Sequence, residues 1–263
     1  MSPSSIGLLC DALGRASERF TTMLRLDPDP SARAIGVWTV GETAAHVSSS
    51  PAYFLAVARG EVAEPEVLDD LGGSNAERLA ADPEREPRVL AQRVERGEEE
   101  LSSYARTADG DPLVRPFAGV DVPLSSVLAI ELSELLVHGD DIARAARLPW
   151  RIPRDEAALA LDGLVPLLPF LVDEQRAIGA RMRCELRIRG GVSVILALEG
   201  GRLRLEPPSS TPVDCRMSVE PVAFLLLSFH RIGLLGPILR GRIVAWGRRP
   251  WRAPTLQAVL KTI

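Results

Sequence analysis

Apolar residues recur at steps of three and four positions through much of residues 1–150, which is the period of helices that bury one face. Long helices joined by short connections pack beside one another around an apolar core. The pattern therefore predicts an up-and-down four-helix bundle with a site in its core, and a shorter helix within residues 61–86. The four long helices are expected at residues 3–26, 39–60, 87–107 and 122–148.

Two of these helices carry further local signals. Thr39 and Glu42 have the spacing of a capping box, which marks the start of the second helix, and that helix is expected to kink at Pro51. The third helix carries a run of charges, and such runs are typical of a solvated face without chemistry. We assign this outer face to Arg93, Glu95, Arg96, Glu98, Glu99 and Glu100.

The pattern changes after residues 148–153, where we expect a linker. A helix over residues 155–177, broken at its prolines, precedes a strict alternation of polar and apolar positions at residues 181–189, which indicates a half-exposed strand. We therefore expect two domains, an all-α domain over residues 1–150 and an α+β domain over residues 151–263. Further strands are expected at residues 192–198, 203–205, 215–219 and 242–246, and helices at residues 221–230, 233–239 and 254–263.

Charge divides unevenly between these two halves. The formal net charge of −4 is the sum of −11 for residues 1–150 and +7 for residues 151–263. A basic half indicates an anionic ligand or contact with the acidic half. Nucleic acid is not an expected partner, because the arginines alternate with apolar residues in the predicted strands and do not cluster with exposed aromatic residues.

The cysteines and the apolar segments indicate where the protein resides. Cys10, Cys184 and Cys215 are an odd number without close pairing in the sequence, which argues against a disulfide framework and for a reducing compartment. The most apolar segment, residues 159–172, is interrupted by two prolines and is too short to span a bilayer. We expect a cytoplasmic protein, monomeric or homodimeric, without a signal peptide or membrane insertion.

A polar stripe runs along the otherwise apolar fourth helix. Glu131, Glu134, His138 and Asp141 lie at offsets of zero, three, seven and ten, so their side chains share one helix face. Burial of such groups costs on the order of several kcal/mol unless something compensates their charge. A divalent cation is the simplest compensation, so the stripe predicts a metal site.

His46, two turns inside the second helix, is placed to converge with Glu134 and His138. Two imidazoles and one carboxylate suit zinc or another divalent transition ion, and three protein ligands leave a fourth position open for water or substrate. Asp141 is a candidate partner of His138 behind the metal or an additional ligand, and Glu131 is a weaker candidate. Hydrogen-bonded core histidines without a metal are the alternative interpretation.

Two segments carry the candidate ligands: Trp38-Thr-Val-Gly-Glu-Thr-Ala-Ala-His46-Val and Glu134-Leu-Leu-Val-His138-Gly-Asp-Asp141-Ile-Ala-Arg. They resemble the two signature segments of the DinB-like, mycothiol-dependent maleylpyruvate isomerase family. The resemblance implies a bundle that binds zinc through His46, Glu134 and His138, with mycothiol as thiol cosubstrate. It also implies a sterol-carrier-like second domain from about residue 180, with residues 233–247 the most similar.

A metal ion with an open position lowers the pKa of a bound thiol. Neither segment contains a cysteine, so the sulfur is expected from a small-molecule thiol. A thiolate that adds to an activated double bond, permits rotation and then leaves isomerises its substrate, whereas a transferase stops after the addition. Arg240 and Arg242 join Asp141 as candidate catalytic residues, since arginine binds carboxylates bidentately, although exposed solubilising arginines are an equal alternative.

Two other functions fit the same sequence. A carrier of sterol-carrier type would bind an apolar ligand between its sheet and helices such as residues 222–229, and the bundle would be a scaffold that needs no metal. A metal-dependent hydrolase would use bound water and no thiol. The third histidine, His230, is interpreted as a partner of a helix C-terminus or as a surface residue.

Overall fold

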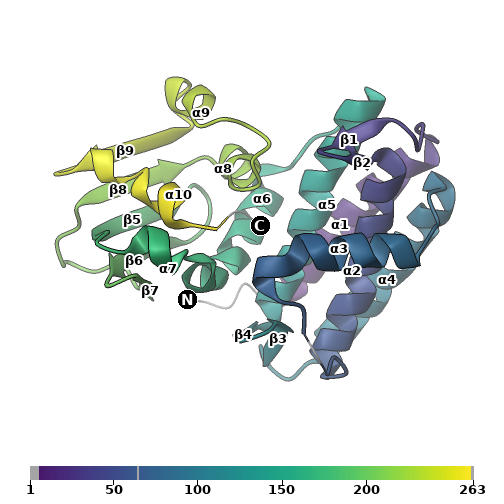
Figure 1. Cartoon of the computed structure of the whole chain (residues 1–263), viewed down its shortest axis with the longest axis horizontal. Helices are drawn as coiled ribbons and strands as arrows, with labels where there is room; N and C mark the ends of the chain where they lie inside the picture. Colours follow the sequence, from purple (N-terminus) through teal and green to yellow (C-terminus); the bar gives the residue numbers. More distant parts are fainter. Residues whose placement is uncertain (1–5, 64, 262–263) are drawn as a thin grey trace. The chain divides into compact units, whose positions relative to one another are not determined.

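The structure, a computed structural model, describes residues 6–63 and 65–261. The first helix was predicted to begin at residue 3 and the closing helix to end at residue 263. Residues 3–5 and 262–263 of these predictions lie outside the described residues. The chain divides into two compact units, one ending at Ile152 and the other beginning at Pro153 (Figure 1). In the described ranges, no helix combines the length and the apolar character needed to cross a bilayer.

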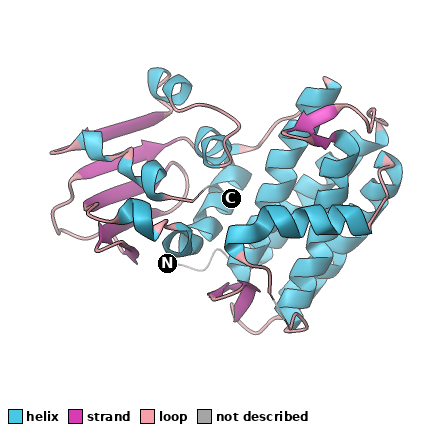
Figure 2. Ribbon diagram, in the orientation of Figure 1, coloured by secondary structure: helices cyan, strands magenta, loops and turns pink. Residues whose placement is uncertain are grey.

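The N-terminal unit is the predicted four-helix bundle, but the predicted up-and-down order, in which consecutive helices are neighbours, is wrong (Figure 2). Helices α1 and α2 each pack against both α4 and α5. The order around the core is therefore α1, α4, α2, α5. Consecutive helices α1 and α2 therefore occupy opposite corners of the bundle. The bounds are α1 Ile6–Arg25, α2 Val40–Arg59, α4 Pro87–Thr107 and α5 Leu124–Ala146.

Local chemistry sets the course of α2. Its capping box is present: Thr39 Oγ1 accepts a hydrogen bond from the Glu42 N–H at 3.2 Å, and Glu42 Oε2 accepts one from the Thr39 N–H at 2.8 Å. The helix continues through Pro51, which has no N–H to donate to the Val47 carbonyl one turn earlier. The Ser50 hydroxyl donates to that carbonyl at 3.0 Å instead, so the proline is accommodated inside the helix.

Two short hairpins precede α2 and α5, where no strand was predicted. Strands β1 (Arg33–Ile35) and β2 (Trp38–Thr39) precede α2, and β3 (Leu113–Phe117) and β4 (Val120–Pro123) precede α5. Each has a two-residue turn containing a glycine with positive φ, Gly36 or Gly119, a conformation that glycine adopts without strain. Strands this short carry too little alternation to be predicted, and α5 accordingly starts two residues later than expected. The short helix expected between α2 and α4 is present as η1 (Leu68–Asp70) and α3 (Leu71–Ala81).

The C-terminal unit has the predicted α+β composition around a five-stranded sheet of order β7-β6-β5-β8-β9. Strands β5 to β7 form the predicted antiparallel meander, β8 pairs parallel with β5, and β9 is an edge strand antiparallel to β8. The strand bounds are β5 Met182–Ile188, β6 Ser193–Glu199, β7 Arg202–Glu206, β8 Cys215–Val219 and β9 Ile243–Gly247.

The helices of this unit are short. The helix predicted over residues 155–177 is interrupted in the stretch that contains its prolines, where a 3-10 segment separates two α-helices. Helix α6 then packs against α8, which follows β8 directly. The bounds are α6 Arg154–Leu164, η2 Val165–Leu171, α7 Glu174–Ala177, α8 Pro221–Ser228, α9 Leu235–Leu239, η3 Pro250–Arg252 and α10 Thr255–Val259.

One expectation from the sequence needs correction here. The premise that arginines do not cluster with exposed aromatic residues fails, because Trp246 and Trp251 are exposed among the arginines of residues 248–252. Their exposure, unlike their spacing, is not visible in the sequence. Cys184 and Cys215 lie together as register partners on β5 and β8, and both are buried free thiols.

Candidate metal centre

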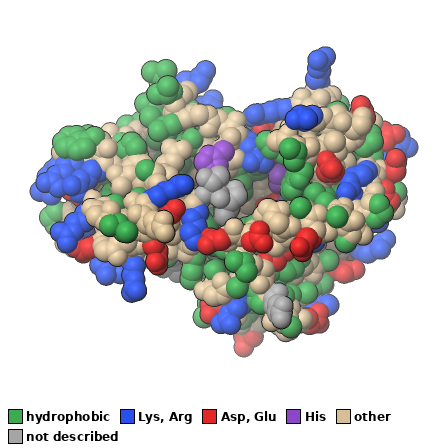
Figure 3. All heavy atoms as spheres, in the orientation of Figure 1, with side chains coloured by type: hydrophobic (Ala, Val, Ile, Leu, Met, Phe, Trp, Pro, Cys, Tyr) green, Lys and Arg blue, Asp and Glu red, His purple; other side chains and the backbone are tan. Residues whose placement is uncertain are grey.

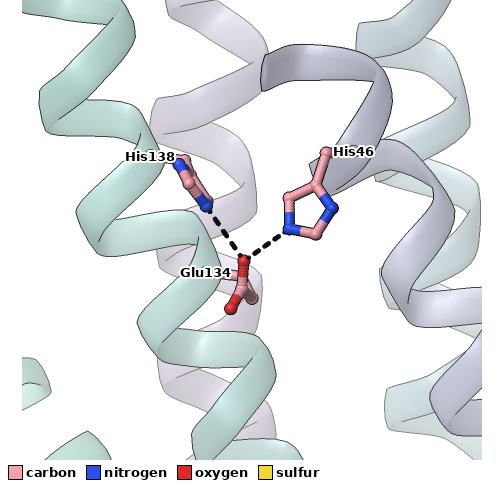
Figure 4. Close-up of side chains that lie close together, drawn as sticks. All are labelled: His46, Glu134 and His138. Atoms are coloured by element: carbon pink, nitrogen blue, oxygen red, sulfur yellow. Dashed lines mark hydrogen bonds and ion pairs between the residues drawn. The ribbon is translucent and has the colours of Figure 1, made fainter. Parts of the chain in front are cut away.

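Three side chains from two helices converge in the bundle (Figure 4). Glu134 and His138 lie one turn apart on α5, and His46 faces them from α2. The Oε2 atom of Glu134 lies 3.0 Å from Nε2 of His46 and 3.2 Å from Nε2 of His138. One nitrogen or oxygen atom from each residue lies within 4.8 Å of the other two, so the structure brings together the three predicted ligands.

The two imidazoles are held in an almost dry environment. His46 is 8% exposed and His138 is 9% exposed. The indole ring of Trp38, which the β1–β2 hairpin places at the start of α2, lies against both, with ring centroids 5.0 Å from His46 and 6.3 Å from His138. Packing of Trp38 on these rings limits their rotation and excludes water from one side of the cluster.

Charge in the cluster is set by burial and hydrogen bonding together. Burial acts to raise the pKa of Glu134, but hydrogen bonds to His138 and His46 outweigh it and hold that pKa well below its ordinary value. Burial acts to lower the pKa of His138, but hydrogen bonds to Asp141 and Glu134 raise it to about 9. At His46 burial prevails, and the pKa is lowered. At neutral pH the metal-free cluster therefore combines an ionised Glu134, a positively charged His138 and a neutral His46.

Asp141 orients one of the imidazoles. Its Oδ2 atom lies 3.0 Å from Nδ1 of His138, and the side chain is buried. Because Nδ1 is engaged by this carboxylate, Nε2 of His138 is the nitrogen directed toward Glu134 and His46. Asp141 therefore lies behind His138 and outside the group of converging ligand atoms, which favours the first of the two roles considered from the sequence.

Glu131, the weaker candidate, also lies outside the ligand group. Its Oε1 accepts a hydrogen bond from Ser50 Oγ at 3.0 Å, and its carboxyl group is hydrogen-bonded to that of Glu98 on α4. Glu98 is 3% exposed, so its assignment to a solvated face is wrong. A signal was present, because Glu98 continues the apolar stripe of Leu90, Val94 and Leu101 at helical spacing.

The buried carboxyl groups of Glu98 and Glu131 affect each other's pKa. Burial raises the pKa of Glu98 to about 7, and burial together with the charge of Glu98 raises the pKa of Glu131 well above its ordinary value. Apart from Glu131, no group among the described residues can donate a hydrogen bond to either oxygen of Glu98. Two adjacent carboxyl groups without a compensating cation do not both ionise, so one of them stays protonated and donates to the other.

The remaining candidates belong to the C-terminal unit. Arg240 follows α9 and Arg242 precedes β9; both are exposed and line an open hollow of about 790 Å³. Their role in binding substrate stays a prediction. His230 is an exposed residue with a φ of 58° after α8, as the surface interpretation expected. Apart from the two arginines, the hollow is lined by Ile232, Gly233, Leu234, Leu235, Gly236 and Pro237.

The sequence of the bundle matches one family over most of its length. Residues 10–143 match the mycothiol maleylpyruvate isomerase N-terminal domain. The chain belongs to this family. The range includes His46, Glu134, His138 and Asp141, so the residues that carried the resemblance in the sequence lie within the family match.

Solved structures agree with the two-domain fold. A mycothiol-dependent maleylpyruvate isomerase covers 91% of this chain and 92% of its own, with a TM-score of 0.54 and 14% sequence identity. A histidine-to-alanine mutant of a mycothiol-dependent maleylpyruvate isomerase matches with the same values. At this identity the likeness concerns the fold. No curated protein sequence matches the chain. The predictions of the family, of the two-domain fold and of an enzyme of this family are confirmed, and the reaction remains to be proposed.

Proposed function

We propose that the protein is a metal- and mycothiol-dependent isomerase or S-transferase that acts on a small, anionic electrophile. One observation carries the proposal: a single carboxylate oxygen of Glu134 lies between the Nε2 atoms of His46 and His138, at 3.0 and 3.2 Å. Membership of the mycothiol maleylpyruvate isomerase family supports the thiol and the reaction class.

The donor set fits a divalent ion, with zinc the preferred candidate. Two imidazole nitrogens and one carboxylate oxygen are a ligand set of catalytic zinc sites. When bound there, such an ion supplies an open position and lowers the pKa of a thiol that occupies it. Glu134 provides the negative charge, Asp141 holds the ring of His138, and Trp38 shields the imidazoles from water.

The sulfur must come from outside the chain. Cys10 is buried and directs its thiol to the Ser102 carbonyl, and burial raises its pKa. Cys184 and Cys215 are buried within the C-terminal sheet. No cysteine is therefore a nucleophile for this site, which favours a low-molecular-weight thiol. Isomerisation follows when the thiolate adds to a conjugated double bond and leaves after rotation; Arg240 and Arg242 are proposed to bind the substrate carboxylates.

Metal content and thiol dependence together test the proposal. The purified protein is assayed for bound metal by elemental mass spectrometry, and for isomerisation of maleylpyruvate with and without mycothiol. We expect near-stoichiometric metal and thiol-dependent turnover, both lost in His46→Ala and His138→Ala. The matched control is His230→Ala, which removes an exposed histidine of the other unit and leaves both unchanged. Absence of metal from freshly prepared and zinc-supplemented protein contradicts the proposal.

The same measurements separate the alternatives. A metal-dependent hydrolase loses activity in His138→Ala but does not respond to mycothiol. A lipid carrier keeps its binding of a fluorescent fatty acid in His138→Ala, because its ligand would lie in the C-terminal unit. A cytoplasmic protein, monomeric or homodimeric, is part of the proposal; its free cysteines accord with a reducing compartment.

A further inference from the structure

One segment of the C-terminal unit is basic throughout. Residues 231–252 contain no aspartate or glutamate. The same segment contains leucine, isoleucine and tryptophan residues between its arginines, so it is both basic and apolar. The six arginines are Arg231, Arg240, Arg242, Arg248, Arg249 and Arg252.

The structure exposes this segment instead of burying it. Between residues 238 and 249 every residue except Ile243 is exposed, because β9 is the edge strand of the sheet. Leu235 is 75% exposed, Leu239 is 85% exposed and Trp251 is 71% exposed. Figure 3 shows hydrophobic and basic side chains gathered at the α9–β9 end of this unit. We call the exposed residues between Leu235 and Trp251 the α9–β9 surface.

The charge of the α9–β9 surface is only partly compensated. Arg249 and Arg252 approach Asp214 only at 3.4 and 3.5 Å. Within the described ranges, no carboxylate forms an ion pair with Arg240, Arg242 or Arg248. Exposed leucines beside unpaired arginines therefore call for a partner that is anionic at its surface and apolar just beneath it.

We propose that the α9–β9 surface docks the protein peripherally on an anionic lipid bilayer. Leu235, Leu239 and Trp251 would enter the boundary between headgroups and acyl chains, while Arg248 binds lipid phosphates. Arg240 and Arg242, proposed above to bind substrate, add to the positive charge of the surface without being assigned to a lipid. Nucleic acid satisfies the arginines and stacks on tryptophan, but it has no apolar layer for the exposed leucines. The chain crosses no membrane in this arrangement; it binds at the surface, and the proposal does not rest on the function proposed for the bundle.

Vesicle sedimentation of the full chain tests the docking. Vesicles of phosphatidylglycerol mixed with phosphatidylcholine are compared with phosphatidylcholine alone, at low and high salt. We expect binding to the anionic vesicles only, released by salt. Arg248→Glu should weaken binding to the anionic vesicles about thirtyfold. The substitution changes the charge of the surface by two units, and each unit is worth about a factor of five near such a bilayer. The Leu235→Ser/Leu239→Ser double variant should also lose binding, because no apolar side chain then enters the bilayer.

Matched variants from the bundle make the test specific. Arg96→Glu and Leu113→Ser alter equally exposed residues of the N-terminal unit and should leave vesicle binding unchanged. Unchanged metal content and circular dichroism show that each variant folds. The proposal is overturned if the protein does not bind anionic vesicles, or if the bundle controls lose binding to the same extent. If the protein does not bind vesicles but binds single-stranded DNA, and the double leucine variant keeps that binding, the surface is a nucleic-acid site instead.

Discussion

Nδ1 of His138 lies 3.0 Å from Oδ2 of Asp141, one turn farther along α5. A carboxylate in this position fixes the ring and raises its basicity as a ligand. Asp141→Asn should therefore weaken metal affinity by about 10- to 100-fold without abolishing it. Competition with a chromophoric chelator measures the change. Asp140→Asn is the control, because that carboxylate pairs with Arg144 at 2.7 Å; equal affinity in the Asp141 variant and wild type contradicts the assigned role.

Metal uptake should release a proton near neutral pH. In the metal-free protein the pKa of His138 is about 9, so below that pH a cation must displace its proton. Apparent affinity should rise about tenfold per pH unit up to about pH 9 and then level off. Calorimetric titration in two buffers of different ionisation enthalpy counts the protons released, and a value of zero at pH 7 would falsify the assignment.

The same shift affects the stability of the metal-free protein. A histidine pKa raised from 6.5 to about 9 contributes stability that is fully present below pH 6.5 and is lost as the pH rises through 9. Urea unfolding of chelator-treated protein between these pH values should show the decline. Asp141→Asn should flatten this dependence, because it removes the carboxylate whose hydrogen bond contributes most to raising the pKa of His138. A slope equal to that of wild type would count against it.

Replacing one of the buried carboxyl groups should stabilise the bundle at alkaline pH. The folded-state pKa of Glu98, about 7, lies above its ordinary value of 4.5, so stability falls as the pH rises through this interval. Glu98→Gln keeps a hydrogen-bond donor toward Glu131 and removes that penalty. We expect a gain of about 1–3 kcal/mol in the free energy of unfolding at pH 8, fading near pH 4.5.

Chemical denaturation at both pH values measures this difference. Glu99→Gln is the matched control, since it changes the next residue of α4, which is exposed. A gain of the same size in the control, or one independent of pH, would show that the buried pair is not its source.

Gly139 allows Trp150 to pack against α5. A Cβ at this position would overlap the Trp150 ring, whose Nε1 donates to the Leu136 carbonyl at 3.2 Å. Gly139→Ala should destabilise the protein by about 1–3 kcal/mol, measured by thermal unfolding. Gly14→Ala on α1 is the control, because its Cβ meets no atom within 4 Å and alanine favours the helix. Equal effects of the two variants contradict the packing argument.

Local interactions explain why much of this protein is predictable. The capping box at Thr39 and Glu42, the apolar stripes of the bundle and the spacing of Glu134, His138 and Asp141 involve residues within a few turns of one another. Helical period alone puts the three residues of α5 on one face. The sequence by itself therefore determined the long helices, the polar stripe and the histidine that would meet it.

Contacts between distant residues were decided by the tertiary structure. The rotation of α4 against α5 turns Glu98 inward onto Glu131, although Glu99, the next residue, is exposed. Sheet pairing brings Cys184 beside Cys215, and the edge position of β9 leaves Trp246 exposed. Each outcome depends on which surfaces are covered when the elements pack against one another. Packing is a property of the assembled chain, and no single segment specifies it.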